Sequence, residues 1–331
     1  MTEQEIEDLL SAPSEADIAA FAKFEGDLIV LGAGGKMGPT LVRRARNAAD
    51  ASGSKLRIYA VARSGPVGVD RVEHIPADLL DRKQVLELPD AANVVYMAGR
   101  KFGSTGNEPL TWAVNAIAPA FVAERYRDSR IVAFSTGNVY PFVPVDSGGA
   151  TESTTPAPIG DYAQSALARE RVFEYYSAQY RTPMVLLRLN YAAEARYGVL
   201  VDIASKVLSR SPVSLEMGYV NIIWQGDANS ACLRSLLLCS TPPLVLNLTG
   251  AERLSVRRLA EDFGRRFGIE PVFEGVESPN ALLSNSSRFR ELLGSGHKPL
   301  GELMDLVAEW LTSGGRTLGK PTHFETRSGT F

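Results

Sequence analysis

Three regularly spaced glycines are the residues of this sequence best suited to holding a charged ligand. Gly32, Gly35 and Gly38 directly follow the apolar run 28–31 and directly precede a helical pattern over 40–49. A strand that turns sharply into a helix beside a pyrophosphate needs residues without side chains at the corner. The N-terminus of the helix then offers free N–H groups and the positive end of its dipole to phosphates. The spacing therefore predicts a dinucleotide-binding turn, with a purely structural turn as the alternative.

Basic residues near this turn indicate which dinucleotide is bound. Lys36 and Met37 belong to the turn itself, and the second apolar run ends at Arg63 without a carboxylate. An acidic residue at that position would bind the ribose 2′-hydroxyl of NAD, whereas an arginine can pair with the 2′-phosphate of NADP. Either basic residue alone could be a solvated surface charge. Together, Arg63 and Lys36 favour NADP as the cofactor over the alternative, NAD.

Seven short apolar runs, separated by helical stretches, are expected to position these residues. The runs are rich in Val, Ile and Leu and do not alternate with polar residues, which is typical of strands buried on both faces. Strands that alternate with helices form right-handed βαβ units. We therefore predict an α/β fold, a Rossmann-type doubly wound parallel sheet of about seven strands, at 28–31, 56–62, 72–75, 94–97, 131–134, 184–189 and 244–248. The segment 141–159, rich in proline and glycine, is predicted to be a loop.

Composition argues against several classes of function. Of 331 residues, 45% are hydrophobic and 22% charged, so a full core can form without disulfides or metals. The formal net charge of −3 gives no field that would attract nucleic acid or an anionic membrane. Cys232 and Cys239 are expected to pack in the core, and with the scattered His74, His297 and His323 they form no metal-ligand cluster. The acidic N-terminus and the lack of a long apolar run predict a cytoplasmic protein.

The pattern divides the chain into three parts. Residues 1–25 are predicted to be an N-terminal helical arm, in which Ser14 caps a helix with Asp17 three residues later. Residues 26–190 form the dinucleotide-binding domain, which also receives about 220–250. A smaller substrate-binding lobe is expected to consist of 191–219 and 251–331.

Further motifs extend the pattern beyond the glycine turn. The sequence resembles the extended short-chain dehydrogenase/reductase family, the NAD(P)-dependent epimerases, dehydratases and reductases that act largely on sugars. The matching motifs occur in the family's order over residues 27–295. They are Gly32, Gly35 and Gly38, then Asp78-Leu79, Ala98-Gly99, Asn115, Phe134-Ser-Thr-Gly-Asn-Val-Tyr140, Tyr162-Ala-Gln-Ser-Ala166, Arg188-Leu-Asn190, Val220-Asn221 and Asn247-Leu-Thr-Gly-Ala-Glu-Arg-Leu-Ser255.

This resemblance implies a role for several of these residues. Asp78 and Leu79 stand where the family contacts adenine. Ala98 and Gly99 stand at its cofactor-lining turn, and Asn115 matches the asparagine of its central helix. A homodimer that pairs the helices predicted at about 110–126 and 161–179 is also implied.

The implied catalytic residues are Thr136, at the family's Ser/Thr position, and Tyr162, which also contacts the cofactor. Thr136 would hydrogen-bond a substrate oxygen, and Tyr162 would give or take its proton. The substrate, a sugar, sugar acid or nucleotide sugar, is expected between the sheet edge and the lobe. Arg196, Asn221 and Trp224 are candidates for contacts to it, with ordinary structural roles as the alternative.

One departure from the family pattern affects the chemistry. The family's lysine, four residues after the tyrosine and on the same helical face, is Ala166 here. An unaided tyrosine has a pKa near 10, so only about one part in a thousand is phenolate at neutral pH. Three interpretations follow: another cation (Arg100, Lys101 or Arg169) replaces the lysine, Tyr162 acts as a neutral acid, or hydride chemistry is lost. The resemblance implies an NAD(P)-dependent oxidoreductase, epimerase or dehydratase, and the alternative is a catalytically impaired NADP-binding regulatory or scaffold protein.

Overall fold

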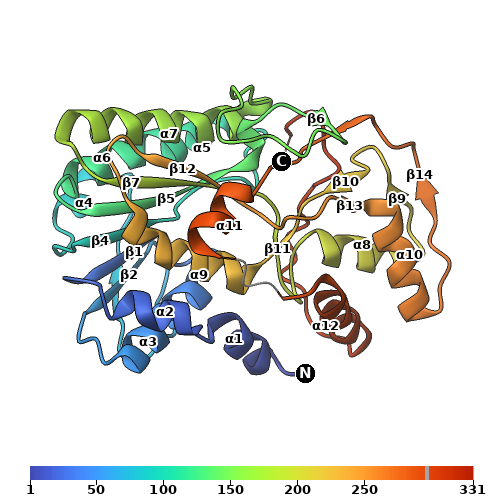
Figure 1. Cartoon of the computed structure of the whole chain (residues 1–331), viewed down its shortest axis with the longest axis horizontal. Coiled ribbons are helices and arrows are strands. Elements are labelled where there is room, and N and C mark those ends of the chain that lie inside the picture. The colour runs from blue at the N-terminus through green and yellow to red at the C-terminus, as the bar shows by residue number, and fades with distance from the viewer. Residues whose placement is uncertain (295–297, 331) are drawn as a thin grey trace.

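A seven-stranded parallel sheet forms the centre of the larger of two parts of the molecule, which confirms the predicted Rossmann-type fold (Figure 1). The structure is a computed structural model that describes residues 1–294 and 298–330, so His297 lies outside the described residues. Neighbouring strands follow the order β3-β2-β1-β4-β5-β7-β12, and every neighbouring pair is parallel. The strands are β1 (Leu28–Leu31), β2 (Ile58–Ala62), β3 (Glu73–Pro76), β4 (Asn93–Tyr96), β5 (Arg130–Thr136), β7 (Met184–Leu189) and β12 (Leu244–Leu248).

The strand order reverses between β1 and β4. The chain adds β2 and β3 on one side of β1 and then returns to place β4 on the other side. In doubly wound sheets, ligands bind beyond the carboxyl ends of the strands at such a reversal. The glycine turn after β1 and the Ala98-Gly99 turn after β4 both lie there, so the fold brings the two motifs together.

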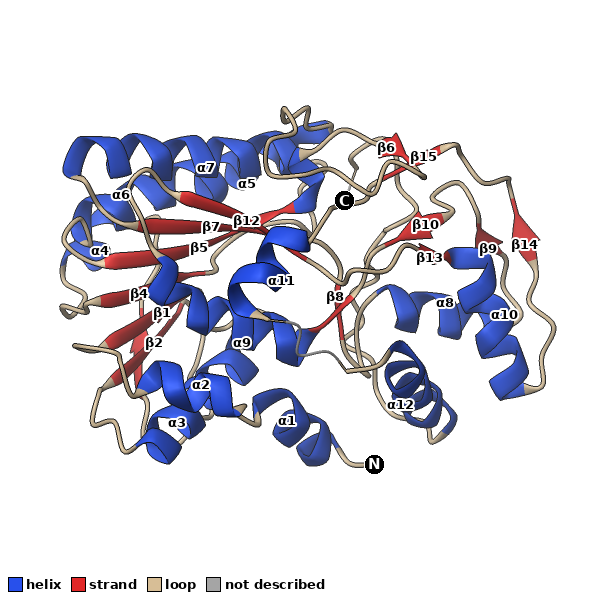
Figure 2. Cartoon of the chain, viewed as in Figure 1, coloured by secondary structure: helices blue, strands red, loops and turns tan. Residues whose placement is uncertain are grey.

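Helices cover both faces of the sheet (Figure 2). Because successive side chains of a strand point to opposite faces, Leu28 and Val30 enter one core while Ile29 and Leu31 enter the other. The first core contains α2 (Glu15–Phe21), α3 (Gly38–Ser52) and α9 (Gln225–Ser235), and the second contains α4 (Arg82–Leu86), α6 (Ala118–Arg125) and α7 (Gly160–Tyr180). Burial on both faces explains why β1 is apolar throughout. The exception is β3, predicted to be buried but half-exposed, because it forms the edge of the sheet.

A smaller lobe with its own apolar core stands beside the sheet, on the right in Figure 1. Its elements are α8 (Val199–Leu208), α10 (Val256–Phe267), α12 (Leu300–Thr312), β9 (Val213–Ser214) paired with β14 (Phe273–Glu274), and β10 (Tyr219–Val220) paired with β13 (Leu254–Ser255). In α10, Val256, Leu259 and Phe263 face the core of the lobe at helical spacing. The helix begins where the Ser255 hydroxyl accepts a hydrogen bond from the Arg258 N–H and ends at Gly268, which adopts the left-handed conformation.

The remaining elements are short. They are α5 (Glu108–Trp112), the π-helical turn η1 (Ala113–Ile117), η2 (Gly137–Val139), β6 (Val143–Pro144), β8 (Ala192–Ala193), β11 (Ile223–Trp224), η3 (Leu236–Leu238), β15 (Asn280–Ala281) and α11 (Ser287–Leu293). β6 pairs with β15 and β8 pairs with β11. The segment 141–159 is therefore not a loop throughout, since it contains β6. In the described part of the chain, no helix has the length and apolarity needed to cross a membrane.

The N-terminal segment contacts both the sheet domain and the lobe. As predicted, Ser14 caps α2: its hydroxyl accepts a hydrogen bond from the Asp17 N–H, and the Asp17 carboxylate accepts one from the Ser14 N–H. Asp17 is fully buried and pairs with Arg44 of α3, with 2.6 Å between Oδ2 and Nη2. The preceding helix, α1 (Glu3–Ser11), buries Ile6 and Leu10 in the core of the lobe. The N-terminal segment thus packs against the sheet domain and the lobe together.

Candidate active site

The glycine turn combines two glycines that the fold requires with one that it does not. Gly32 has a φ of +88°, and a Cβ there would lie 2.6 Å from the backbone nitrogen of Ala98. A Cβ on Gly38 would overlap the carbonyl group of Ala33. At Gly35, by contrast, a Cβ would meet only the Gly32 carbonyl oxygen at 3.5 Å, an ordinary contact. A bare backbone at position 35 therefore serves no packing need, but it does allow a phosphate to approach closely.

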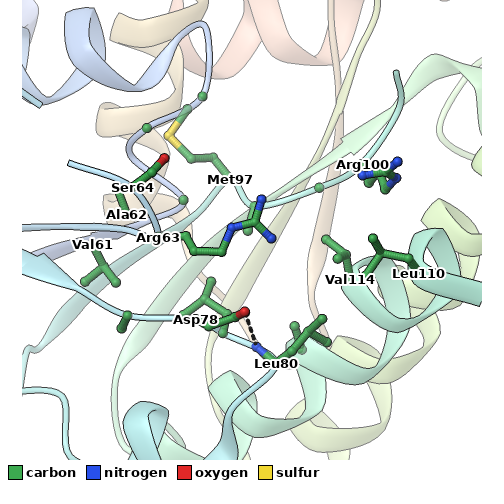
Figure 3. A pocket seen from close by; sticks show the side chains of 18 of the residues that line it. Val61, Ala62, Arg63, Ser64, Asp78, Leu80, Met97, Arg100, Leu110 and Val114 are labelled. Atoms are coloured by element: carbon green, nitrogen blue, oxygen red, sulfur yellow. Dashed lines mark hydrogen bonds between the residues drawn. The ribbon is translucent and has the colours of Figure 1, made fainter. Parts of the chain in front are cut away.

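A first cavity opens at this turn. Gly32, Gly35, Ala98 and Gly99 line it, together with Val61, Ala62, Arg63, Ser64, Asp78, Leu79 and Val114. The Arg63 side chain extends into the cavity between Asp78 and Met97 (Figure 3). Arg63 is exposed, and no carboxylate within the described ranges pairs with it. The Asp78 carboxylate accepts a hydrogen bond of 3.0 Å from the Leu80 N–H, which fixes its orientation at the cavity wall (Figure 3).

Lys36 and Arg63, the two basic residues that were predicted together to favour NADP, lie in different places. The Lys36 ammonium is 3.3 Å from the ring centroid of Tyr197 and 4.3 Å from that of Phe102. These contacts place it, with Met37, in the wall of a second cavity, whereas Arg63 lines the first. Phe102 and Gly35 line both, so the cavities adjoin. The geometry therefore leaves Arg63 as the basic residue of this pair that faces the first cavity.

The second cavity contains the two residues of the implied catalytic pair. Thr136 ends β5, and Tyr162 lies in the first turn of α7. The two side chains are hydrogen-bonded, and the Thr136 hydroxyl also accepts a bond of 3.2 Å from the Asn138 N–H. Burial raises the pKa of the Tyr162 phenol, and the hydrogen bond from Thr136 and the charge of Arg169 offset this only in part. The phenol is therefore protonated at neutral pH.

The alanine at the lysine position faces away from this cavity. Ala166 is fully buried and packs in a small apolar cluster with Val139, Tyr140 and Ala150. It is not among the residues that line the second cavity. A lysine at this position would have to leave that apolar cluster to reach Tyr162.

Arg169, from the same helix, supplies a positive charge to the site instead. Its guanidinium donates hydrogen bonds of 2.8 Å to the Phe134 carbonyl and 2.6 Å to the Asn115 side-chain oxygen. Only 6% of its surface is exposed, and no carboxylate within the described ranges lies within ion-pair distance. Its Nε has no hydrogen-bond partner. Gly99 makes room for this group, because a Cβ there would lie 2.6 Å from Nη2.

The other two candidate cations are placed differently. The Arg100 guanidinium turns to the Gly103 carbonyl, at 2.9 Å. The Lys101 ammonium donates a bond of 3.0 Å to the Thr322 carbonyl and lies 5.9 Å from the Tyr162 ring centroid. Burial lowers the pKa of Lys101 to about 8. Of the three, Arg169 has the most buried charge in the wall of the second cavity.

Asn115 holds these parts together from the π-helical turn η1. Its side-chain oxygen accepts a hydrogen bond of 2.9 Å from the Arg100 N–H in addition to that from Arg169. Its side-chain nitrogen donates to the Arg100 carbonyl and to the Ser165 hydroxyl. Single π-helical turns are frequent at functional sites. Asn115 thereby fixes the loop after β4, Arg169 and the start of α7 relative to one another.

The three proposed substrate contacts have structural partners instead. Arg196 pairs with Glu194 and Glu7, at 3.0 and 2.7 Å. The Asn221 side-chain nitrogen donates a hydrogen bond of 2.9 Å to the Glu252 carbonyl, and its side-chain oxygen accepts one from the Ser284 N–H. Trp224 packs in the core of the lobe with 8% of its surface exposed. None of the three lines the second cavity.

Two segments supply polar lining residues of the second cavity that sequence reasoning missed. Tyr191 and Tyr197 line the second cavity. Tyr191 directly follows the Arg188-Leu-Asn190 motif and Tyr197 comes six residues later, so the motif was the available signal. Tyr191 has a φ of +49°, a conformation that non-glycine residues rarely adopt and that concentrates at functional sites. Lys320 and Thr322 come from the end of the chain, which has no periodic pattern. Sequence alone offered no means of placing those two.

The fold and the site together define a Rossmann-type dinucleotide-binding protein with a Thr-Tyr pair at the end of its sheet. The model of the NAD dependent epimerase/dehydratase family matches residues 28–199. The chain therefore belongs to that family, as the motifs indicated. None of the curated proteins matches the sequence.

Solved structures resemble the whole fold at low sequence identity. MoeE5 in complex with UDP-glucose and NAD has 20% identity and a TM-score of 0.73, over 87% of this chain and 99% of that one. UDP-glucose 4-epimerase from Thermotoga maritima, with UDP-glucose, has 17% identity and a TM-score of 0.73 over 87% and 99%. DesIV, a dTDP-glucose 4,6-dehydratase from Streptomyces venezuelae with NAD bound, has 17% identity and a TM-score of 0.73 over 87% and 97%. At these identities the likeness concerns the fold.

Proposed function

We propose that this chain is an NADP-dependent enzyme, an oxidoreductase, epimerase or dehydratase, that acts on a sugar-like substrate. The observation that carries the proposal is Arg169, a buried cation for which the described ranges provide no carboxylate, in the cavity of Thr136 and Tyr162. Burying such a charge without a counter-ion costs stability, and a ligand-binding role would explain why it is present. A protein that only sensed NADP would not need it beside a Thr-Tyr pair. Arg169 thereby takes over the electrostatic role of the lysine that Ala166 replaces.

The first cavity suits an adenine dinucleotide. Gly35 leaves room for the pyrophosphate, and the N-terminus of α3 favours its negative charge. The exposed Arg63 side chain is placed to pair with a 2′-phosphate, which supports NADP over NAD. Asp78 and Leu79 at the cavity wall are proposed to contact the adenine. When bound, the nicotinamide group accepts or supplies the hydride.

Thr136 and Tyr162 are proposed to handle the proton that accompanies the hydride. Because the pKa of Tyr162 is raised, its phenol can donate a proton to a substrate carbonyl oxygen in the direction of reduction. In the direction of oxidation Tyr162 must first release that proton, and the charge of Arg169 stabilises the resulting phenolate. Thr136 holds the same substrate oxygen by a hydrogen bond.

The variant Gly35→Ala tests the cofactor assignment. We expect the dissociation constant for NADP to rise about tenfold to a hundredfold, or about 1.4 to 2.7 kcal/mol, with an unchanged melting temperature because the added methyl group has space. The matched control is Gly301→Ala, at a helical glycine with no atom within 4 Å of its Cβ position. Calorimetric titration measures both. If NADP and NAD both fail to bind the unaltered chain, the proposal is wrong.

Turnover is the second measurement. NADPH consumption, followed by its absorbance, is tested against sugars, sugar acids and nucleotide sugars, with Tyr162→Phe as the inactive reference. We expect at least one substrate to be turned over. Absence of turnover with every compound, in a chain that binds NADP, would favour the regulatory or scaffold alternative instead.

We also propose that the protein is a homodimer. Large apolar side chains are exposed on α5, η1 and α7, among them Ile117 at 50% and Tyr175 at 62%. Sedimentation analysis of the chain and of the double variant Ile117→Asp/Tyr175→Asp would test this, with the variant expected to be monomeric. The cytoplasmic location stays a prediction from the sequence.

A further inference from the structure

The second cavity carries a strong positive charge. Four cationic side chains line it (Lys36, Lys101, Arg169 and Lys320), and none of its described lining residues is Asp or Glu. The chain as a whole has a formal net charge of −3, so this charge does not follow from composition. The four cations come from the glycine turn, the loop after β4, α7 and the C-terminal segment. Cations placed together in a cavity repel one another unless an anionic ligand compensates them.

Lys36 shows this repulsion most clearly. Its ammonium is held between the rings of Tyr197 and Phe102, which compensate a cation only in part. No carboxylate of the described residues lies within ion-pair distance of it. Burial, followed by the charges of Lys101 and Lys320, lowers the pKa of Lys36 to about 7, and Asp202 opposes this shift only weakly.

The C-terminal segment 317–324 holds Lys320 beside Lys36. The Leu318 N–H donates a bond of 3.0 Å to the Arg196 carbonyl on one side of Lys320. On the other side, the Thr322 N–H and hydroxyl donate bonds of 2.8 and 2.6 Å to the Asp202 carboxylate. These bonds fix the backbone around Lys320 and occupy Asp202. Lys320 itself is exposed at the cavity, and no carboxylate of the described residues lies within ion-pair distance of its ammonium group.

We propose that the substrate is an acid, and that Lys36 and Lys320 bind a carboxylate or phosphate on its reacting part. This inference rests on the proposed function and names the substrate class. Because the same cavity holds Thr136 and Tyr162, the anion and the reacting hydroxyl or carbonyl group belong to one molecule. An uncharged sugar would leave the lysines uncompensated, so the cavity selects against it. Lys36 and Lys320 are therefore specificity-determining residues.

Calorimetric titration of the full chain saturated with NADP tests this with matched pairs of ligands. UDP-glucuronic acid against UDP-glucose isolates a carboxylate, and glucose 6-phosphate against glucose isolates a phosphate. We expect the acidic member of one pair to bind at least about tenfold more tightly. In Lys36→Met/Lys320→Met this preference should fall to about twofold or less. Lys83→Met, at a lysine exposed on α4, is the control and should keep it.

Two results would overturn the inference. One is that no acidic member binds more tightly than its neutral counterpart in either pair. The other is that the double lysine variant weakens NADP as much as it weakens the acid, which would assign the lysines to the cofactor. The pairs are also titrated without NADP. The preference for an acidic ligand is therefore measured independently of NADP binding, and so independently of the proposed function.

Discussion

Two buried arginines, Arg188 on β7 and Arg169 on α7, differ in what surrounds their charge. Arg188 on β7 is 3% exposed and forms a two-pronged pair with Glu170 of α7, at 2.9 and 2.6 Å. Its remaining nitrogen donates to the Tyr140 hydroxyl at 2.7 Å. Arg169, the residue before Glu170, is equally buried but has only a carbonyl and an amide oxygen as partners. The paired charge supports the fold, whereas we propose that the unpaired charge serves a ligand.

Removing the paired arginine should have the largest effect on stability. Arg188→Met leaves Glu170 buried without its counter-ion, and we expect a loss of about 3–5 kcal/mol in the free energy of unfolding. Urea denaturation measures this loss. The double variant Arg188→Met/Glu170→Leu should recover much of it, because neither charge then remains buried. A single variant as stable as the unaltered chain would refute the structural role of the pair.

Removing the unpaired arginine should act on catalysis. We expect Arg169→Met to lower kcat about a hundredfold to a thousandfold, the range for removing one preorganised electrostatic group, and Arg169→Lys to restore part of it. The free energy of unfolding should fall much less than in Arg188→Met, because hydrogen bonds to two neutral oxygens are lost but no buried carboxylate loses its counter-ion. Steady-state kinetics and urea denaturation are run on the same samples. Loss of stability with intact kcat would make Arg169 a structural residue like Arg188.

Lys36 extends the comparison to a cation that costs stability. Its pKa falls from 10.5 to about 7, so the unfolded chain binds more protons between these pH values. The unaltered protein therefore gains stability as pH rises through this range. We expect Lys36→Met to be more stable than the unaltered protein at pH 7, and this advantage should shrink toward pH 9.5. Urea denaturation at several pH values, with Lys83→Met as control, measures it; an advantage that grows with pH would contradict the assignment.

Arg63 is an exposed cation, and its effect should be the smallest. Arg63→Ser should raise the dissociation constant for NADP about tenfold, or about 1.4 kcal/mol, because one charge-assisted contact is lost. Affinity for NAD and the melting temperature should stay the same. Calorimetric titration of both cofactors gives the ratio. Equal weakening of NADP and NAD would separate Arg63 from the 2′-phosphate.

The sheet could be predicted because its strands are buried on both faces and therefore leave continuous apolar runs in the sequence. The runs at 28–31, 184–189 and 244–248 coincide with β1, β7 and β12. Edge and very short strands leave no such trace, which is why β3 was taken as buried and β6 was missed. The glycine turn was found for the same reason as the sheet, since steric contacts at Gly32 and Gly38 dictate the residue type locally.

The positions of the charged side chains in the site were harder to predict, because they depend on contacts between segments that are distant in the sequence. Arg169 lies seven residues after Tyr162, and only the space above Gly99 lets its guanidinium enter the cavity wall. Lys36 belongs to the glycine turn in sequence, yet two aromatic rings from distant segments draw its ammonium into the other cavity. Lys320 is positioned by hydrogen bonds of its neighbours to Arg196 and Asp202. Spacing along the helix made Arg169 a candidate, but the positions of Lys36 and Lys320 depend on contacts between segments distant in sequence.

The opening helices have a practical consequence for anyone who would divide this protein. A fragment that starts at residue 28, where the family match begins, would keep every recognisable motif. It would also lose Asp17, leaving the interior guanidinium of Arg44 without its counter-ion. The lobe would lose Ile6 and Leu10 and expose the apolar surface that they cover. The first two helices stabilise the sheet domain and the lobe together. A fragment that is to keep the fold must therefore include them, although the family match begins only at residue 28.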